Sequence, residues 1–323
     1  MTPAPFPEFL PEVEKALVAQ LGGEAPPRDT LLTAARHLCL GGGKRARPLL
    51  VRIFGEALGV DPRQLVVPAT AAELIHAASL LHDDVVDSGM FRRGKPTVNS
   101  RWGNTVAVMS GDLLLSGALL ELARHAPFLV ESALAVIAEM TRAAILEVEV
   151  RGRLDLPLET LEQIATGKTG SLFGWCGVAA ALVKGDRDAA AAFDAFGRRL
   201  GVAFQMADDI RDITGADEGK SPHADLQSRS PSLAILLAVK REPRLRARIQ
   251  EAWGYGALTP EKARELGTAI LCSGAIEEAI ERMEAAIEAS VSALGPYAQS
   301  ETGAALVGWA RQIARGIALQ GAA

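Results

Sequence analysis

The chain has 323 residues, of which 49% are apolar and 5% aromatic, and it carries a formal net charge of −5 at pH 7. This acidic balance provides no basic footprint for nucleic acid, so no nucleic-acid partner is expected. Ordinary glycine and proline contents exclude a fibrous or disordered chain, and the abundance of alanine and leucine, which are strong helix formers, predicts an all-α fold.

In chain order, the first helices are expected at residues 8–21, 29–40, 48–58 and 66–88, followed by a loop at 89–97. Further helices are predicted at 103–124, 128–150, 158–183, 187–213, 231–240, 243–255, 260–271, 274–293 and 301–319. We see no alternating segment long enough for a strand, and no linker divides the chain. The sequence therefore predicts one all-α domain over residues 1–323, a bundle of long helices around a central cavity.

The cysteines and the apolar segments bear on the location of the protein. Cys39, Cys176 and Cys272 lie far apart in apolar surroundings and are expected to be buried free thiols, as in cytosolic proteins. The amino-terminal residues lack the basic region and apolar core of a signal peptide. The nearest candidate for a membrane span, residues 106–120, is short and interrupted by Asp112. We therefore expect a cytoplasmic protein with no transmembrane segment.

Two D-D-x-x-D motifs are the strongest functional signal in the chain. Each follows an apolar helical run, and the carboxylates they contribute are Asp83, Asp84, Asp87, Asp208, Asp209 and Asp212. At ~100° per residue, the three carboxylates of one motif fit on a ~100° arc of a helix. One such motif is also compatible with a solvated helix end, but two copies with the same spacing favour a shared role. Carboxylates at the end of a buried helix need cations, and Mg²⁺, which binds one or two carboxylates together with phosphates, suits them.

Cationic side chains accompany the acidic motifs. Lys44 and Arg47 lie at a glycine-rich loop that leads into a helix, where backbone N–H groups can cradle phosphate. The stretch lacks the G-x-x-x-x-G-K-[ST] spacing of a nucleotide P-loop. The other members of this set are Arg92, Arg93, Lys168 and Lys220. His76 is either a core residue or a phosphate donor. Together the charges indicate two diphosphate ligands and several magnesium ions.

The motifs resemble those of the trans-isoprenyl diphosphate synthases, also called polyprenyl synthetases. The matching segments are Gly43-Lys44-x-x-Arg47-Pro48, His76-x-x-x-x-x-His82-Asp83-Asp84-x-x-Asp87, Arg92-Arg93-Gly94, Lys168-Thr169, and Phe204-Gln205-x-x-Asp208-Asp209-x-x-Asp212 with Gly219-Lys220. They occur in the family's order over nearly the whole chain. The resemblance implies a prenyltransferase of isoprenoid biosynthesis with an isoprenoid-synthase-type bundle, usually a homodimer, and about three Mg²⁺ ions per site.

The resemblance also implies roles for individual residues. The diphosphate of isopentenyl diphosphate is expected to contact Lys44, Arg47, His76 and Arg93. The allylic diphosphate is expected to contact Arg92, Lys168, Thr169, Gln205 and Lys220. The expected metal ligands are Asp83, Asp87 and Asp208, supported by Asp84, Asp209 and Asp212. Catalysis would rest on these six carboxylates and on Lys168 and Lys220, which stabilise the diphosphate that leaves as the allylic C–O bond ionises.

Two positions depart from the family pattern. Ser230 stands where a second lysine is usual, with Arg229 adjacent to it, and Gly152 stands where glutamine is expected. A guanidinium is not equivalent to an ammonium, so Arg229 is an imperfect substitute. These changes are compatible with slower turnover or with an unusual allylic substrate.

Product length should depend on the residues just before the first acidic motif. Ala78 and Ser79 precede Asp83 by five and four residues, and both are small. Because no aromatic side chain closes the cavity there, we expect a product of C20 or longer, such as geranylgeranyl diphosphate or a longer polyprenyl diphosphate. Two alternatives are a class I terpene cyclase, whose second metal motif normally mixes Asn, Ser or Thr, and Glu, and a non-catalytic subunit of a heteromeric prenyl synthase.

Overall fold

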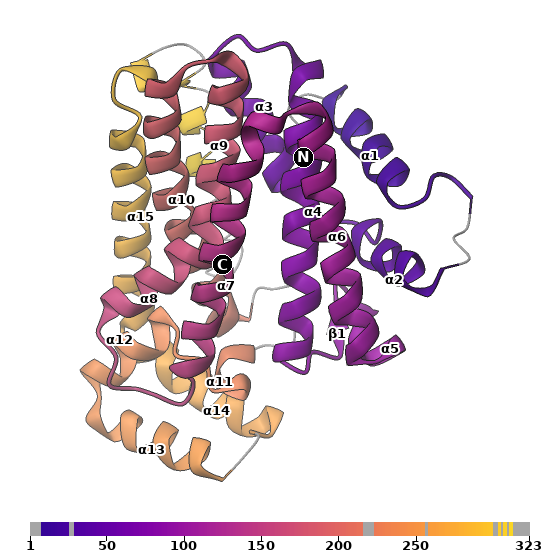
Figure 1. Ribbon diagram of the computed structural model, residues 1–323. Coiled ribbons are helices and arrows are strands. Elements are labelled where there is room, and N and C mark those ends of the chain that lie inside the picture. The colour runs from indigo at the N-terminus through magenta and orange to yellow at the C-terminus, as the bar shows by residue number, and fades with distance from the viewer. Residues whose placement is uncertain are drawn as a thin grey trace. The chain divides into compact units, whose positions relative to one another are not determined.

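The computed structural model describes residues 8–25, 29–215, 223–255 and 258–299, together with 303–304, 306–308 and 310–312. The chain divides into two compact units: unit 1 comprises residues 1–137, 172–194 and 299–306, and unit 2 comprises residues 138–171, 195–298 and 307–323. Within the described residues both units are almost entirely helical, which confirms the predicted all-α class (Figure 1). The single domain expected over residues 1–323 stays a prediction.

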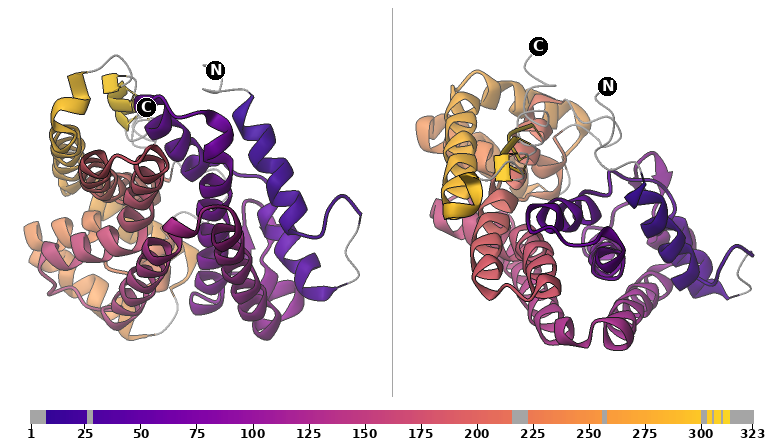
Figure 2. Two further views of the ribbon diagram at one scale, coloured as in Figure 1. Left: turned by 45° about the horizontal axis from the view of Figure 1, so that its top comes forward. Right: turned by 90° about the horizontal axis from the view of Figure 1, so that it is seen from above.

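Unit 1 is built mainly from the amino-terminal helices. These are α1 (Phe9–Gln20), α2 (Thr30–Cys39), α3 (Ala46–Ala57), α4 (Pro62–Val86), α5 (Val98–Trp102) and α6 (Asn104–His125). The 3-10 turn η1 (Pro127–Leu129) leads into α7 (Val130–Glu149), and α9 (Ser171–Lys184) precedes α10 (Arg187–Thr214). Helices α7 and α10 contribute residues to both units. Within unit 1, α4 packs extensively along α6, as Figure 1 shows, and Figure 2 gives two further views.

Helix α4 begins at a strong amino-terminal signal and is buried along most of its length. The carboxylate of Asp61 accepts a hydrogen bond from the backbone N–H of Arg63, and Pro62 takes the first helical position, where its missing N–H is not needed. Leu65 and Leu81 on this helix are fully buried. The sequence is apolar on all sides of α4, so the helix enters the core and carries the first acidic motif with it.

Helices α4 and α6 are the two described helices that are long and apolar enough to cross a membrane by length and composition. In the most apolar window of α4, 67% of the residues are buried, as in the core helix of a soluble protein, whereas the figure for α6 is 33%. The side of α6 that remains exposed carries Met109, Leu113 and Leu120. The expectation that the chain has no transmembrane segment stays a prediction.

Unit 2 encloses an apolar core of its own. The helices around this core are the later part of α10, α12 (Leu233–Arg241), α13 (Pro243–Gly254), α14 (Pro260–Leu271) and α15 (Ala275–Ala293). Shorter elements of this part of the chain are α8 (Leu158–Ala165), the π-helical turn η2 (Thr166–Gly170) and α11 (Ala224–Ser228), and the 3-10 turn η3 (Gly295–Gln299) follows α15. Ile210, Leu237 and Met283 are among the core residues, each almost completely buried. The second acidic motif lies on the part of α10 that enters this core.

The long helices agree with the predicted ranges to within a few residues, but the predicted loop at 89–97 contains a short hairpin. Its strands are β1 (Phe91–Arg92) and β2 (Lys95–Pro96), and Arg93 and Gly94 close the turn with φ values of 53° and 71°. Two successive positive φ values match the twist of a two-residue hairpin. This turn could not be predicted from the sequence because arginine seldom adopts a left-handed conformation.

Other predictions need smaller corrections. Helices α5 and α11, each five residues long, are absent from the predicted list because so short a helix shows too little periodicity. The helix expected at 158–183 is divided by η2, and much of the helix expected at 301–319 lies outside the described residues. Cys39 and Cys176 are buried, whereas Cys272 is exposed, so the expectation of a buried thiol is wrong for Cys272.

The close packing of α4 on α6 leads to a test. A Cβ atom at Gly111 of α6 would lie 2.3 Å from Nε2 of His82 on α4. We expect Gly111→Ala to lower the free energy of unfolding by about 1–3 kcal/mol, because the added methyl group overpacks the interface. Gly117→Ala in the same helix is the control, since its Cβ would meet nothing closer than 3.9 Å, and it should stabilise the helix by up to about 1 kcal/mol. Urea unfolding followed by circular dichroism measures both, and equal stability of the two variants would contradict the prediction.

Candidate active site

The glycine-rich loop before α3 is anchored by a buried arginine. Arg45 has a left-handed backbone conformation (φ 48°), and its side chain is 7% exposed. Its guanidinium donates hydrogen bonds to the carboxylates of Glu73 on α4 (2.7 Å) and Glu14 on α1 (2.5 Å), and to the carbonyl O of Cys39 (2.7 Å). The adjacent Lys44 is exposed. Arg45 therefore holds the loop in place, whereas Lys44 is accessible to a ligand.

The side chains of Arg47 on α3 and His76 on α4 are hydrogen-bonded to each other. Nη1 of Arg47 donates a hydrogen bond to Nε2 of His76 at 3.1 Å, and the guanidinium lies 5.1 Å from the centroid of the Phe173 ring. Burial, reinforced by the positive charges of Arg47 and Arg93, lowers the pKa of His76 well below its usual value. A neutral imidazole whose Nε2 accepts a hydrogen bond carries its proton on Nδ1, which remains a donor. The two roles expected for His76, as a core residue or as a phosphate donor, both stay predictions.

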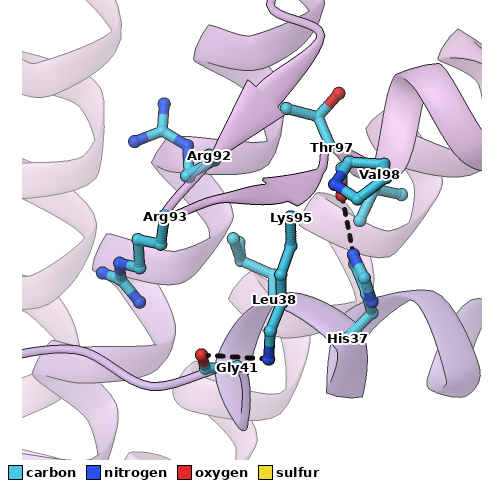
Figure 3. Close-up of a pocket in the computed structure, with 9 residues that line it drawn as sticks. His37, Leu38, Gly41, Arg92, Arg93, Lys95, Thr97 and Val98 are labelled. Atoms are coloured by element: carbon cyan, nitrogen blue, oxygen red, sulfur yellow. Dashed lines mark hydrogen bonds between the residues drawn. The ribbon is translucent and has the colours of Figure 1, made fainter. Parts of the chain in front are cut away.

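The hairpin β1–β2 is tied to the glycine-rich loop and to α2 (Figure 3). The hydrogen bonds that tie it run from Arg93 to the carbonyl O of Gly42, from Lys95 to that of Gly41 (3.4 Å), and from His37 to that of Pro96 (2.7 Å). Gly43 must be a glycine, because its φ is +149° and a Cβ there would lie 2.8 Å from Nη1 of Arg93. Arg93 is thereby brought to the same loop as Lys44.

The first acidic motif, at the carboxyl end of α4, contains one buried carboxylate. Asp84 is 4% exposed and accepts hydrogen bonds from Nε and Nη2 of Arg92 at 2.8–3.1 Å. Asp83 is half-buried and Asp87 is exposed. Because the carboxyl end of a helix is itself negative, this cluster demands positive charge. Arg92, which the sequence assigns to the allylic diphosphate, supplies part of that charge to Asp84 in the structure.

The two small residues expected to set product length lie about one turn before this motif. Ala78 is fully buried. Ser79 is half-buried, and its hydroxyl donates a hydrogen bond to the carbonyl O of His76 at 2.8 Å. The side chain of Ser79 is therefore turned back along α4 and occupies little space beside the helix.

The second acidic motif is held by donors from unit 2 itself. Oδ1 of Asp208 accepts a hydrogen bond from Arg211, one turn further along α10. Asp209 accepts hydrogen bonds from the backbone N–H of Leu233 (2.9 Å) and from the side-chain amide of Gln205 (3.1 Å). Burial raises the pKa of Asp209 to about 7 despite these two donors. The position of Asp209 is thus set by α10 and by the start of α12.

Asp212, the last carboxylate of the motif, is bound by the start of α11. The backbone N–H of His223 donates to the main-chain carbonyl O of Asp212 (3.1 Å). The N–H groups of Ala224 and Asp225 donate to its carboxylate oxygens Oδ1 (2.8 Å) and Oδ2 (3.1 Å). Three successive N–H groups therefore converge on Asp212. Two of them donate to the carboxylate and stabilise its negative charge.

Lys168 and Thr169 lie on the π-helical turn η2, a feature that is frequent at functional sites. Nζ of Lys168 donates a hydrogen bond to Oε2 of Glu147 on α7 at 2.5 Å, and the hydroxyl of Thr169 donates to Oε1 of Gln205 at 3.4 Å. Lys168, Gln205 and Asp209 line one cavity of about 60 Å³. Unit 2 therefore brings together the predicted allylic-side residues that the structure describes there.

The remaining predicted residues show how the family pattern is altered. Lys220 lies outside the described residues. Ser230 lines the same small cavity as Lys168. Gly152 has a φ of +79°, and its N–H donates to the carbonyl O of Arg229 at 2.8 Å. This left-handed conformation accounts for glycine at position 152 in place of the expected glutamine.

Sequence reasoning missed Arg45, Glu73 and Glu147. Each is recognisable only from a partner distant in the chain, since Arg45 binds Glu73 and Glu147 binds Lys168. The sequence offers one weak signal: Glu73 is a charged residue inside the apolar run of α4, and a buried charge requires a partner. The identity of that partner is fixed by the fold.

The donor set suits a divalent cation that shares its ligands with phosphate. In the part of the chain that the structure describes, no three His, Cys, Asp or Glu side chains are grouped so that they could hold a metal ion by themselves. Mg²⁺ binds through one or two carboxylates and completes its shell with water and substrate phosphates. Carboxylates at the end of α4, with a diphosphate, meet this requirement.

Comparisons with known proteins agree with this chemistry. The polyprenyl synthetase family model matches residues 28–270. The chain is 34% identical to a short chain isoprenyl diphosphate synthase from Methanothermobacter thermautotrophicus, over 79% of this chain and 77% of that protein. It is 33% identical to the heptaprenyl diphosphate synthase component 2 of Geobacillus stearothermophilus, over 84% and 82% of the two chains. A solved polyprenyl synthase from Caulobacter crescentus CB15, complexed with calcium and isoprenyl diphosphate, superposes with a TM-score of 0.87 at 27% identity and covers 95% of this chain and 94% of its own.

The chain therefore belongs to the polyprenyl synthetase family, which confirms the predicted resemblance and the isoprenoid-synthase type of fold. The family makes prenyl diphosphates and uses divalent metal ions, and its activity class is prenyl transfer. The relatives named above differ in product, since one is a short-chain enzyme and the other belongs to a heptaprenyl synthase.

The anchor of the glycine-rich loop can be tested by removing Arg45. We expect Arg45→Ala to lower the free energy of unfolding by about 3–5 kcal/mol, because it leaves the buried carboxylate of Glu73 without its partner. Arg63→Ala is the control, since Arg63 pairs with Asp61 at the surface and its loss should cause no measurable change. Urea unfolding measures both variants, and similar effects of the two substitutions would contradict the role given to Arg45.

Proposed function

We propose that the protein is a trans-prenyltransferase that condenses isopentenyl diphosphate head-to-tail with an allylic diphosphate, with loss of diphosphate. The observation that carries the proposal is the hydrogen bond between Arg47 and His76 (3.1 Å), together with the bond of Arg93 to the glycine-rich loop at Gly42. Arginine side chains and a loop that leads into a helix are the combination that binds diphosphate. Membership of the polyprenyl synthetase family supports the same chemistry.

The two substrate diphosphates would be bound by two different sets of residues. We assign the diphosphate of isopentenyl diphosphate to Lys44, Arg47, His76 and Arg93, all in unit 1. We assign the allylic diphosphate to Lys168, Thr169, Gln205 and Lys220 of unit 2 and to Arg92. Fixing two substrates in one geometry removes much of the entropic barrier to their reaction. We further propose that both units work as one domain, since the family match runs from residue 28 to 270 through both.

The proposed reaction begins as the allylic C–O bond breaks and its electron pair leaves with the diphosphate. Arg92, Lys168 and Lys220 offset the negative charge that develops on that group. The double bond of isopentenyl diphosphate then attacks the allylic carbocation, and the new carbon–carbon bond forms. The resulting cation loses a proton, for which the departed diphosphate is a sufficient base. No side-chain general base is needed.

We propose Mg²⁺ as the divalent ion, about three per site, held by Asp83, Asp87 and Asp208. When bound, it would supply further positive charge to the leaving diphosphate. Asp84, Asp209 and Asp212, which accept hydrogen bonds from Arg92, Leu233 and Ala224, are proposed as the supporting carboxylates.

We propose a product of C20 or longer. Ala78 and Ser79 are small, and the hydroxyl of Ser79 is bonded back to α4, so neither closes the space beside the helix with a bulky group. The chain has relatives among both short-chain and heptaprenyl synthases, which is compatible with this range.

We also propose a cytoplasmic homodimer. The exposed side of α6 carries Met109, Leu113 and Leu120, which share one face at helical spacing. Phe128 of η1 and Leu134 of α7 are also exposed apolar side chains. A second copy of the chain would cover the exposed face of α6 and remove apolar area from water. Light scattering coupled to gel filtration measures the mass, and a stable monomer at micromolar concentration would reject the dimer.

Two other functions are alternatives to the proposed prenyltransferase. A class I terpene cyclase binds one diphosphate, and therefore has little use for the cluster at Lys44, Arg47 and His76. A non-catalytic subunit of a heteromeric synthase is suggested by the similarity to heptaprenyl diphosphate synthase component 2. Intact acidic motifs in both units favour a catalytic chain over either alternative.

A product assay tests the proposal and its alternatives. Purified protein is incubated with Mg²⁺, isopentenyl diphosphate and each allylic primer from C5 to C20, and the products are separated by chain length. We expect condensation to C20 or beyond, and products that stop at C15 would reject the proposed length. A cyclised hydrocarbon from geranylgeranyl diphosphate alone would favour the cyclase. Activity that requires a second subunit would favour the heteromeric alternative.

The role of the first acidic motif is tested by Asp83→Ala. We expect this variant to lose at least about 100-fold in kcat, because stabilisation of the leaving diphosphate is weakened. Asp188→Ala, which removes an exposed carboxylate in the first turn of α10, should retain wild-type activity. Near-normal turnover of Asp83→Ala would refute the assigned role.

A further inference from the structure

We propose that the imidazole of His223 is a wedge between α11 and α14, that Gly267 is the notch which receives it, and that this contact positions Asp212. The role for Asp212 rests on the proposed function. The contact itself is independent of it, because it joins two helices of unit 2.

The fit between the ring and the glycine is close. His223 is 7% exposed and lies immediately before α11. A Cβ atom on Gly267 of α14 would lie 2.4 Å from Cε1 and 2.6 Å from Nδ1 of the ring. Among the described residues, Nδ1 of His223 has no hydrogen-bond partner. The ring therefore acts through its volume, and only glycine at position 267 leaves room for it.

The backbone of His223 explains how this contact reaches Asp212. His223 is left-handed (φ 61°), a conformation that is unfavourable for a residue with a side chain and that needs support from its surroundings. In this conformation, the N–H groups of residues 223, 224 and 225 all donate to Asp212. The contact of the ring with Gly267 stabilises the left-handed turn at His223, and this turn directs the three N–H groups toward Asp212.

The middle of α11 is fixed independently. Nε1 of Trp253 on α13 donates a hydrogen bond to the carbonyl O of Leu226 at 3.0 Å. Because α11 is also held at Leu226, a displacement of the ring is transmitted to the three N–H groups that donate to Asp212. His223 and Gly267 are thus positioning residues for Asp212.

The test is a double-mutant cycle with Gly267→Ala, His223→Gly and the two combined. In Gly267→Ala the methyl group displaces the ring, and we expect kcat/KM for the allylic substrate to fall by about tenfold or more, since a shift of about 1 Å can cost ~100-fold. His223→Gly removes the wedge but favours the left-handed turn, so it should lose less. The double variant should match His223→Gly, because the methyl group added at position 267 is harmless once the ring is gone. Gly254→Ala, where a Cβ would meet nothing within 4 Å, is the control.

Amide hydrogen exchange supplies a readout that does not depend on catalysis. The N–H groups of Ala224 and Asp225 should exchange faster in Gly267→Ala than in the wild type, and the double variant should return to the level of His223→Gly. If the wild type proves inactive in prenyl transfer, these exchange rates still test whether the His223 ring positions the turn. Wild-type exchange and activity in Gly267→Ala would overturn the proposal, as would a double variant that is as impaired as, or more impaired than, Gly267→Ala.

Discussion

Compensation of buried negative charge is the constraint on which this structure depends. Each acidic motif is carried by a helix that enters an apolar core, where an unpaired carboxylate is costly. In unit 1 the buried Asp84 is paired with Arg92. In unit 2 Asp209 accepts hydrogen bonds from the backbone N–H of Leu233 and the amide of Gln205, and the carboxylate of Asp212 accepts them from two backbone N–H groups. These contacts hold the hairpin β1–β2 to α4, and α11 and α12 to α10.

The two modes of compensation have different consequences. An arginine partner such as Arg92 can exchange its carboxylate for a phosphate, because both are recognised by the same planar group of donors. Backbone N–H groups are fixed by the fold and cannot follow a ligand. The partner of Asp84 could therefore respond to a phosphate ligand, whereas the N–H groups that bind Asp209 and Asp212 keep a fixed arrangement. Burial raises the pKa of Asp209 despite its two donors, so they offset the cost of its charge only in part.

The long helices could be predicted from the sequence because helical periodicity is a local pattern, and the candidate site residues are likewise proposed from local motifs. Helical periodicity identifies α4 and α10, and the spacing D-D-x-x-D places three carboxylates on one arc without knowledge of the fold. Three features could not be predicted. The hairpin uses arginine at a left-handed position, the π-helical turn has no periodicity of its own, and the partners Glu73 of Arg45 and Glu147 of Lys168 come from distant segments. Such features depend on tertiary contacts, which override local preference.

In the proposed reaction, helix α4 would connect diphosphate binding to the control of product length. His76 and Asp83 are seven residues apart, which places them on one face about 10 Å apart along the axis. One rigid helix would thus set the spacing between the isopentenyl diphosphate and the metal-bound diphosphate. Ser79 lies only about 40° from Asp83 around this helix, whereas Ala78 lies about 140° away. Because Ser79 is half-buried and Ala78 is fully buried, the growing chain should pass Ser79 more closely, and Ala78 should act mainly through the packing of α4.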